Sequence, residues 1–273
     1  MDVVMTIAGS DSGGGAGIQA DLKTFQELKV FGTSVITALT AQNTLGVDGI
    51  FPTTPEFVTQ QLSAIFNDFD VKALKTGMLF SADIIACVAE KMKEQDLQIV
   101  VDPVMIAKGG ASLLQQEAVD ALKSKLLPIA TVLTPNIPEA EVMTGMTIQT
   151  QSDIQKAAAQ ILEKGVQCVV MKGGHLEEDE FATDRVFLAN GSSFKMQSKR
   201  IKTKHTHGTG CTFSAVITAF LGRGFSLQEA IIEAKKFVQA AIEYPLHLGH
   251  GHGPTNHFAY QMDHKVEVMV SEA

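Results

Sequence analysis

Short apolar runs rich in β-branched residues alternate with amphipathic segments along most of this 273-residue chain. Brief apolar runs that end in polar or glycine-rich sequence are typical of buried strands in a parallel sheet. Six such strands are predicted at residues 3–8, 34–39, 74–76, 99–102, 131–134 and 168–171. Helices are predicted at residues 16–28, 55–66, 82–93, 116–126, 152–164, 212–221 and 227–243. This order predicts an α/β fold with a doubly wound, mostly parallel sheet and helices on both faces.

One edge of the sheet is predicted to carry an antiparallel hairpin. Residues 184–188 and 194–198 flank an Asn-Gly pair at 190–191, a strong signal for a hairpin turn. No linker, low-complexity stretch or internal repeat divides the chain. We therefore expect one domain over residues 1–273, with a peripheral tail after about residue 258.

Composition narrows the classes of function. The formal net charge of −8 gives no positive surface for nucleic acid or for an anionic membrane. The first residues lack a basic leader, and no apolar stretch is long enough to span a bilayer. Three cysteines without Cys-x-x-Cys spacing indicate neither a disulfide framework nor a zinc site. We expect a soluble, cytoplasmic protein that acts on a small molecule, with no nucleic acid or membrane partner.

The segment Thr-His-Gly-Thr-Gly-Cys-Thr at 206–212 leads directly into a predicted helix. Unpaired N–H groups and the positive end of the helix dipole would face an anion there, and Gly208 and Gly210 would allow a close approach. A helix N-terminus lowers a thiol pKa, so Cys211 is a candidate general base. The alternative is a glycine-rich turn with a buried structural cysteine.

A second glycine-rich loop, residues 9–21, follows the first strand and opens the first helix. Its Gly-x-Gly-x-x-Ala run at 15–20 formally matches the dinucleotide fingerprint, but Thr-Ala-Gln-Asn stands at 40–43 where that motif needs an acidic residue. The P-loop does not fit either, because no lysine follows the glycines. The loop offers backbone donors with Asp11 and Asp21 as acceptors, which suits a small polar ring; a purely structural tight turn is the alternative.

Phosphoryl transfer requires a metal, charge neutralisation and a positioned base. Asp102 ends the fourth predicted strand, Asn136 and Glu139 follow the fifth, and Lys172 follows the sixth. Each alone is typical of a turn or a helix cap. Because the carboxyl ends of parallel strands meet at one edge of a sheet, we expect these side chains to lie together.

These motifs resemble the ribokinase-like superfamily. Asn136-x-x-Glu139 and the Gly208-x-Gly210 loop are similar to its paired signatures. The resemblance narrows to the vitamin-kinase branch, which holds hydroxymethylpyrimidine and phosphomethylpyrimidine kinases of thiamine biosynthesis and pyridoxal kinases. It is carried by residues 7–21, 41–44, 75–78, 102–105 and 207–212 and extends to about residue 257.

The resemblance implies an acceptor site for an aminopyrimidine. Gly9 would lie at this site, and Asp21 and Gln42 would hold the ring nitrogens and amino group. Met78 and Met105 would lie beside the ring. An acceptor and an amide can read an aminopyrimidine edge together, and thioethers form polarisable apolar walls.

The resemblance also implies a kinase that uses ATP and Mg²⁺ and forms a homodimer. Cys211 would be the general base, and the amides at 208–211 would stabilise the transferring charge. Asp102 and Glu139 would hold Mg²⁺ largely through water. The residues implied to bind ATP are Asn136, Lys172, Thr206 and Thr209.

Several alternatives stay open at this point. The nearest is a pyridoxal or pyridoxine kinase, which the segment 41–44 disfavours; a nicotinamide-dependent oxidoreductase and a non-catalytic vitamer-binding protein are weaker. Four histidines near the C-terminus could form a metal site or belong to a mobile loop that edges the nucleotide pocket. They are His247, His250, His252 and His257.

Overall fold

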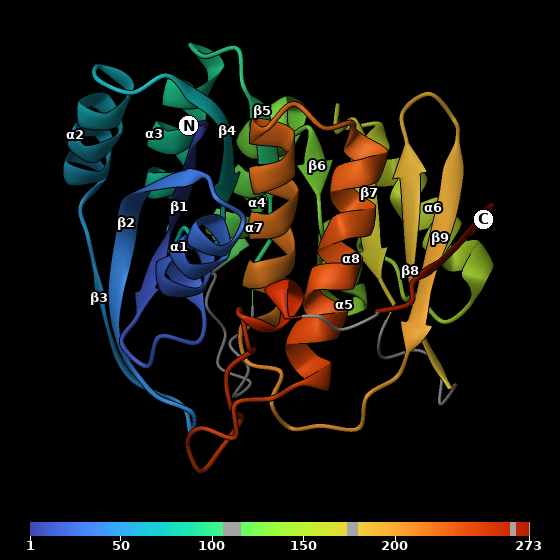
Figure 1. Ribbon diagram of the computed structural model, residues 1–273. Coiled ribbons are helices and arrows are strands. Elements are labelled where there is room, and N and C mark those ends of the chain that lie inside the picture. Colours follow the sequence, from blue (N-terminus) through green and yellow to red (C-terminus); the bar gives the residue numbers. More distant parts are fainter. Residues whose placement is uncertain (106–115, 174–179, 263–265, 273) are drawn as a thin grey trace.

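The protein is described by a computed structural model that covers residues 1–105, 116–173, 180–262 and 266–272. Within these residues, ten strands form one sheet in the order β10-β9-β8-β7-β6-β5-β4-β1-β2-β3 (Figure 1). The strands are β1 Val3–Asp11, β2 Phe31–Gln42, β3 Val47–Pro52, β4 Val71–Thr76, β5 Gln98–Val101, β6 Val132–Leu133, β7 Cys168–Lys172, β8 Phe181–Leu188, β9 Ser193–Lys199 and β10 Met269–Glu272.

The centre of the sheet is parallel and its edges are antiparallel. Strands β2, β1, β4, β5, β6 and β7 pair in parallel. Strand β3 pairs antiparallel with β2 at one edge, and β8, β9 and β10 form antiparallel pairs at the other. The carboxyl ends of the parallel strands therefore share one edge of the sheet, where ligands bind in folds of this kind.

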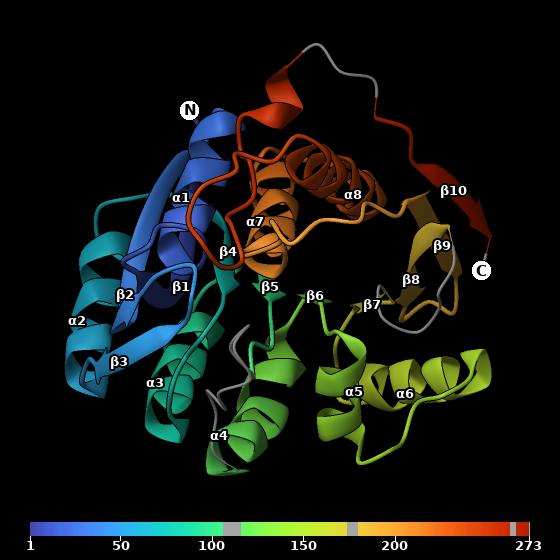
Figure 2. The ribbon, with the colours of Figure 1, turned by 90° about the horizontal axis from the view of Figure 1, so that it is seen from below.

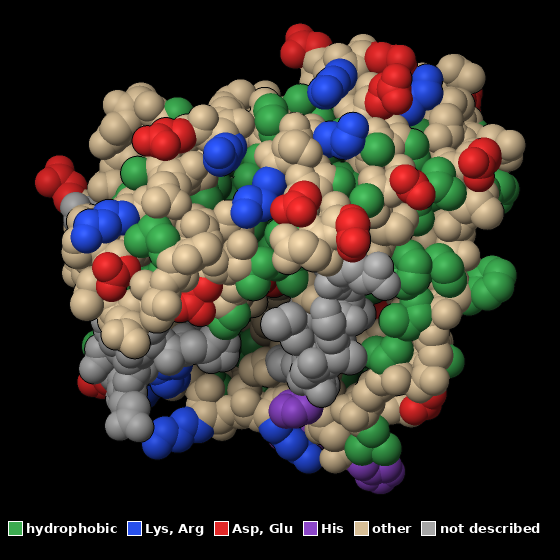
Figure 3. Space-filling model, turned by 180° about the vertical axis from the view of Figure 1, so that it is seen from behind, with side chains coloured by type: hydrophobic (Ala, Val, Ile, Leu, Met, Phe, Trp, Pro, Cys, Tyr) green, Lys and Arg blue, Asp and Glu red, His purple; other side chains and the backbone are tan. Residues whose placement is uncertain are grey.

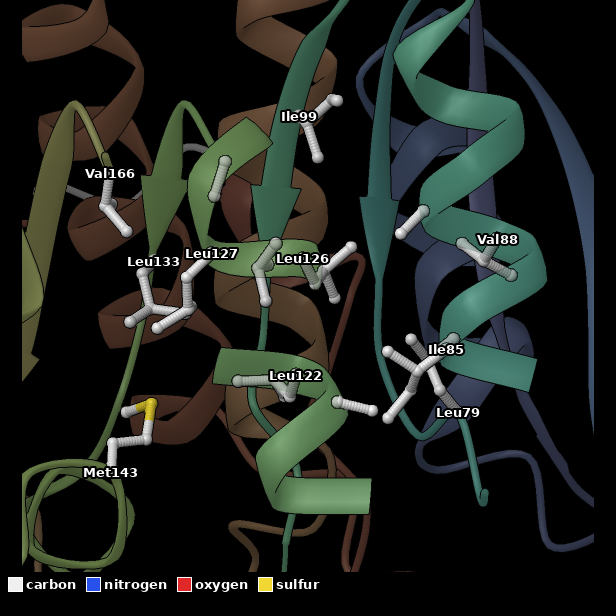
Figure 4. Close-up of a cluster of buried hydrophobic side chains, with 14 of the residues drawn as sticks. Leu79, Ile85, Val88, Ile99, Leu122, Leu126, Leu127, Leu133, Met143 and Val166 are labelled. Atoms are coloured by element: carbon white, nitrogen blue, oxygen red, sulfur yellow. The ribbon is translucent and has the colours of Figure 1, made fainter. Parts of the chain in front are cut away.

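Helices cover both faces of the sheet, as Figure 2 shows. They are α1 Gly17–Glu27, α2 Pro55–Phe66, α3 Ala82–Lys93, α4 Gln116–Ala121, α5 Ile137–Thr144, α6 Gln151–Leu162, α7 Thr209–Gly222 and α8 Leu227–Glu243. On one face α2 to α6 enclose a large apolar core; on the other, α1, α7 and α8 enclose a second. Figure 4 shows part of the first core, with Ile85 and Val88 of α3 and Leu133 of β6 turned into the space between helices and sheet.

Helix α7 lies at the middle of its face and is buried on all sides from Thr212 to Gly222. Its C-terminal glycine is needed for packing, because a methyl group at Gly222 would lie 2.4 Å from Cγ1 of Val4. Because α7 is buried along its length, its N-terminus is held firmly against the sheet, near the carboxyl ends of β1, β4 and β5.

Among the described residues, no helix is long and apolar enough to cross a membrane.

The predicted fold class is confirmed, with the predicted parallel strands and the hairpin of β8 and β9 in place. Strand β2 is longer than predicted, and β3, β10 and α5 were not predicted. The predicted helix at 116–126 is α-helical to Ala121 and continues as a π-helical turn over Leu122–Leu126. The tail predicted as peripheral after about residue 258 supplies β10, an exposed edge strand.

A buried ion pair connects the sheet to the helices beneath the carboxyl ends of the strands. Lys75 of β4 and Asp21 of α1 are both fully buried, with Nζ 2.7 Å from Oδ1. Thr6 of β1 donates a hydrogen bond to Asp21 at 2.6 Å, and Lys75 also donates to the carbonyl oxygen of Cys211 at 3.4 Å. Burial raises the pKa of Asp21, and Lys75 acts against that rise. The carboxylate therefore depends on Lys75 for its charge.

Replacing Lys75 with Met should lower the free energy of unfolding by about 3–5 kcal/mol, because Asp21 is then a buried charge without a partner. Urea unfolding at neutral pH measures this loss. The double variant Lys75→Met/Asp21→Leu should recover most of it, since no buried charge remains. Lys72→Met is the matched control, because Lys72 pairs with Asp70 at the surface of the same strand. Equal unfolding midpoints for Lys75→Met and Lys72→Met would refute the structural importance of the pair.

Candidate functional site

A cavity of about 780 Å³ lies along the carboxyl ends of the strands. One end is formed by residues in the carboxyl ends of β1 and β2 and directly after β4, and the other by residues of β8, β9 and α8. The N-terminus of α7 lies between these two ends, with Gly208, Thr209, Gly210 and Cys211 in the wall. The shape of the cavity is therefore compatible with two ligands, one at each end, that meet at the N-terminus of α7.

Three of the predicted acceptor-site residues line the first end of the cavity: Gly9, Gln42 and Met78. Met78 packs directly over Gly9, because a methyl group at Gly9 would lie 2.4 Å from Cε of Met78. The Oγ1 atom of Thr37 donates a hydrogen bond to the carbonyl oxygen of Met78 at 2.6 Å, which fixes the loop after β4. This end has an apolar thioether wall and a polar amide, as the sequence predicted.

The other two predicted acceptor residues are both buried. Asp21 is fully buried beneath the cavity, where its carboxylate is occupied by Lys75 and Thr6. Met105 is buried in the apolar core that α2 to α6 enclose. Neither Asp21 nor Met105 is among the residues that line the cavity, and their contact with a substrate stays a prediction.

The two glycine-rich loops touch each other backbone to backbone. Gly208 has a φ of +85°, and a methyl group there would lie 1.8 Å from the carbonyl oxygen of Gly15. Gly17, with a φ of +55°, would likewise collide with the carbonyl oxygen of Gly9 at 2.2 Å. Gly208 is required by the contact between the two loops, Gly17 by a contact within the loop 9–21, and both by their positive φ angles.

The first turn of α7 has the properties of an anion site. Gly208 is the N-cap residue and provides no side chain to cap the helix. Amide N–H groups in the first turn of a helix have no partner within the helix, and the helix dipole adds positive potential. Thr206 and Thr209 line the cavity beside this turn. The predicted anion cradle at 206–212 is thus a helix N-terminus open to the cavity.

The Cys211 thiol differs from its prediction. The residue is partly exposed and lines the cavity. Burial nevertheless raises the pKa of its thiol to about 12, although the Lys75 ammonium acts to lower it; Asp21 and Asp102 raise it further. The expectation of a lowered pKa is therefore wrong, since burial outweighs the Lys75 ammonium and the hydrogen bond from the Gly17 backbone.

A lysine and a carboxylate lie directly beside the first turn of α7, where a methyl group at Gly210 would be 3.6 Å from both Asp102 Oδ2 and Lys172 Nζ. Nζ of Lys172 lies 3.4 Å from Oδ1 of Asp102, which is 2 % exposed. Ser214 of α7 donates to the other oxygen of Asp102 at 3.4 Å. Burial alone would lower the pKa of Lys172, but Asp102 and Glu139 raise it, so the ammonium stays charged. Asp102 and Lys172 lie together, as the positions after their strands predicted.

Asn136 and Glu139 form a capping box at the start of α5. The Asn136 side chain accepts from the Glu139 N–H at 2.8 Å, and Glu139 accepts from the Asn136 N–H at 2.7 Å. The motif therefore has a structural role in addition to its place in the cavity wall. Burial raises the pKa of Glu139 to about 7; Lys172 lowers it and Asp102 raises it.

The donor set fits a magnesium ion that arrives with a nucleotide. Asp102 and Glu139 both line the cavity. Mg²⁺ is typically held by one or two carboxylates together with substrate phosphates and water. Within the ranges that the structure describes, no group of three His, Cys, Asp or Glu side chains could hold a metal ion.

The C-terminal histidines have structural contacts. His247 packs edge-on against His205, with ring centroids 4.9 Å apart. His257 is buried, its Nε2 lies 3.1 Å from Oγ1 of Thr212 on α7, and burial lowers its pKa to about 4. The segment that follows α8 thus packs on the N-terminus of α7, at the lower side of Figure 1. The expectation of a mobile loop at the nucleotide pocket is wrong for His257, which supports α7.

Three residues of the site region were not predicted from sequence. Lys75 could have been recognised as a lysine within a short apolar strand. Lys235 lies on the buried face of α8 and pairs with Asp184 at 2.8 Å, at the second end of the cavity. His207 pairs with Asp11 at 2.8 Å. The sequence contains no signal for the His207 contact, because the two residues are 196 positions apart.

Known proteins share this arrangement. A family model described as phosphomethylpyrimidine kinase matches residues 11–256. The hydroxymethylpyrimidine/phosphomethylpyrimidine kinases of Haemophilus influenzae and Bacillus subtilis are 57% and 56% identical to the chain; each alignment covers 94% of this chain and 97% or 95% of the relative. The pyridoxal kinase of Staphylococcus aureus in complex with AMP-PCP and pyridoxal superposes with a TM-score of 0.92 at 35% identity, covering 100% of this chain and 99% of that one.

The match to the family model includes the loop after β1, the N-terminus of α7 and all of the cavity-lining residues except the three that precede residue 11. The structural match extends over the whole sheet, including its antiparallel edges, and confirms the ribokinase-like fold. The enzymatic expectation is confirmed with it, since the relatives are phosphotransferases by name. The chain therefore belongs to the phosphomethylpyrimidine kinase family.

Proposed function

We propose that this enzyme transfers the γ-phosphoryl group of ATP to 4-amino-5-hydroxymethyl-2-methylpyrimidine, to its monophosphate, or to both, in thiamine biosynthesis. The observation that carries the proposal is the continuous cavity with the N-terminus of α7 between its two ends. An acceptor at the first end and a nucleotide at the second would meet at this helix N-terminus. Positioning of this kind, together with charge stabilisation, is the main requirement for phosphoryl transfer.

The first end suits a small aminopyrimidine. Gln42 supplies an amide with both a donor and an acceptor, Met78 supplies an apolar wall, and Gly9 leaves the room into which the Met78 thioether packs. An aminopyrimidine presents a ring nitrogen beside an amino group, which an amide can pair with in two hydrogen bonds. The names of the pyrimidine kinases from Haemophilus influenzae and Bacillus subtilis agree with this substrate class.

The second end and the middle of the cavity suit ATP. Lys172, Asn136, Thr206 and Thr209 surround the position where the phosphates would lie, beside the open amides of α7. Mg²⁺ held by Asp102 and Glu139 would neutralise phosphate charge when it is bound. Val238, Gln239 and Ile242 of α8 would face the nucleoside. The AMP-PCP complex of the Staphylococcus aureus pyridoxal kinase supports nucleotide binding in this fold.

A homodimer and a cytoplasmic location are part of the proposal. The β2–β3 edge exposes Leu39, Leu45 and Phe51, whose exposed fractions are 47%, 71% and 71%. Figure 3 shows hydrophobic side chains gathered on the side of the molecule formed by α2 and β3. An apolar surface on an edge strand is a frequent site of association between subunits. The use of ATP is compatible with the cytoplasm.

Product identification tests the proposed function directly. The enzyme is incubated with Mg-ATP and hydroxymethylpyrimidine, its monophosphate or pyridoxine, and the products are identified by mass spectrometry. A phosphorylated pyrimidine supports the proposal. Turnover of pyridoxine alone would contradict it and would favour a pyridoxal kinase, the second candidate, which the close superposition on the Staphylococcus aureus enzyme supports.

Replacing Gln42 with Met should lower kcat/KM for hydroxymethylpyrimidine by roughly tenfold or more, because loss of a hydrogen bond to a buried partner costs about 1–3 kcal/mol. Pyridoxine presents a phenolic oxygen and a methyl group to the same side chain, so any activity with pyridoxine should fall less. Steady-state kinetics with both acceptors measures the difference. An equal fall for both acceptors would show that Gln42 does not select the pyrimidine.

Cys211 is the proposed general base, and its pKa sets a condition on that role. With a pKa of about 12, the thiolate is a small fraction at neutral pH. Below the pKa this fraction rises tenfold for each unit of pH. The nearby ammonium groups of Lys75 and Lys172 favour the thiolate, and the thiolate would take the proton of the acceptor hydroxyl group.

Turnover limited by the Cys211 thiolate should therefore rise with pH, with a slope near one in a plot of log kcat/KM between about pH 8 and pH 9.5. Glu139, with a pKa of about 7, is already ionised over this range. Cys211→Ala should lose at least roughly 10²-fold in kcat and should also lose the slope. A Cys211→Ala enzyme with near-normal turnover, or with the same slope, would rule out this residue as the base.

A further inference from the structure

His207 connects the two glycine-rich loops through its side chain. It stands between Thr206 and Gly208 at the entrance to α7, and all three residues line the cavity. Its Nε2 atom lies 2.8 Å from Oδ2 of Asp11, the last residue of β1. Its backbone N–H donates to Gly253 at 3.1 Å, and its carbonyl oxygen accepts from Thr255 at 3.1 Å. The position of the imidazole ring is thus fixed by contacts of both its backbone and its side chain.

The partners of Asp11 determine which nitrogen of His207 carries the hydrogen. The Asp11 carboxylate accepts N–H hydrogen bonds from Gly13, Gly15 and Ala16 at 2.8, 3.1 and 2.8 Å. Burial alone would raise the pKa of Asp11, but hydrogen bonds from His207 and the backbone lower it. An ionised carboxylate only accepts hydrogen bonds, so Nε2 of His207 must be the donor.

This assignment has a consequence for Gln42. An amide nitrogen of Gln42 facing Nε2 of His207 at 3.4 Å would place two donors against each other. On its other side, the amide oxygen would face Oγ1 of Thr40 at 3.1 Å, although the hydroxyl hydrogen is directed to the carbonyl oxygen of Ser10 at 2.8 Å. Turning the amide by 180° removes both mismatches. The Gln42 oxygen then faces the Nε2–H group of His207, whose single hydrogen is shared between Asp11 at 2.8 Å and Gln42 at 3.4 Å, and the NH₂ group of Gln42 donates to Thr40.

We propose that His207 is a positioning residue that fixes the orientation of the Gln42 amide and thereby the choice of acceptor. The inference rests on the proposed function, because it assumes that Gln42 reads the acceptor ring. After its contacts with His207 and Thr40, the Gln42 amide still has one hydrogen and one oxygen lone pair that can bind a ligand. This pair matches a ring nitrogen next to an amino group. The same imidazole also holds the loop after β1 against the N-terminus of α7.

Two substitutions of His207 by amide side chains of different length, Gln and Asn, test the proposal. The side-chain nitrogen of Gln can occupy the place of Nε2, so His207→Gln keeps an N–H donor for Asp11 and Gln42. The side chain of Asn is one methylene group shorter, and His207→Asn loses both contacts. The exposed His252 lies outside the cavity wall, and His252→Gln is the control for a histidine substitution as such.

The readouts are kcat/KM for each acceptor, KM for ATP and the unfolding midpoint Tm. We expect His207→Asn to lower kcat/KM for hydroxymethylpyrimidine at least tenfold relative to His207→Gln, and to lower the preference for the pyrimidine over pyridoxine. KM for ATP and Tm should be similar in the two variants. In the double variant with Gln42→Met, the loss from His207→Asn should be much smaller, because the two residues act through one contact.

Equal kcat/KM values for His207→Gln and His207→Asn would overturn the proposal, whether both resemble the unmodified enzyme or both fall together with Tm. The proposed function is tested separately, by the acceptors that the unmodified enzyme phosphorylates. If that enzyme phosphorylates only pyridoxine, the ratio between the two variants is measured with pyridoxine. A ratio near one then refutes the positioning role as well, and a ratio of at least tenfold retains it for the other acceptor.

Discussion

The backbone contact between Gly208 and Gly15 is the constraint on which the site depends. No side chain larger than hydrogen fits between these two residues, and Gly208 also requires a positive φ. The contact brings the N-terminus of α7 directly against the loop that follows β1. Gly9 and the first turn of α7 therefore line one continuous cavity, and the proposed acceptor and phosphate positions would be neighbours.

The central sheet could be predicted because its strands are buried on both faces and read as brief apolar runs. Strands β3 and β10 escaped prediction because they are exposed edge strands without such runs. Helix α5 has eight residues, too few to display a helical period, although Asn136 and Pro138 are typical of a helix start. Gly9, Gln42 and Met78 were placed at the cavity through the resemblance to the vitamin kinases, and all three lie at the carboxyl ends of parallel strands.

Side chains inside the site were harder to predict, because their properties depend on partners distant in the sequence. Asp21 was expected to contact the substrate, but Lys75, which lies 54 positions away, holds it beneath the cavity. The thiol of Cys211 shows the same limit. A helix N-terminus favours a thiolate, and this much can be read from sequence. The cost of removing the thiol from water depends on the whole surrounding structure, and it outweighs the Lys75 ammonium.

The strand order places the first segment of the chain inside the sheet, third from one edge, between β2 and β4. The last support of the site comes from the other end of the sequence, where Gly253 and Thr255 bind the backbone of His207 and where His257 contacts Thr212. During synthesis the sheet can begin to assemble as the nascent chain emerges, since its N-terminal strands are made first. The N-terminus of α7 gains its contacts with residues 253–257 only when these residues have left the ribosome, so a polypeptide that ends before them can have the N-terminal strands of the sheet but lacks this support of the site.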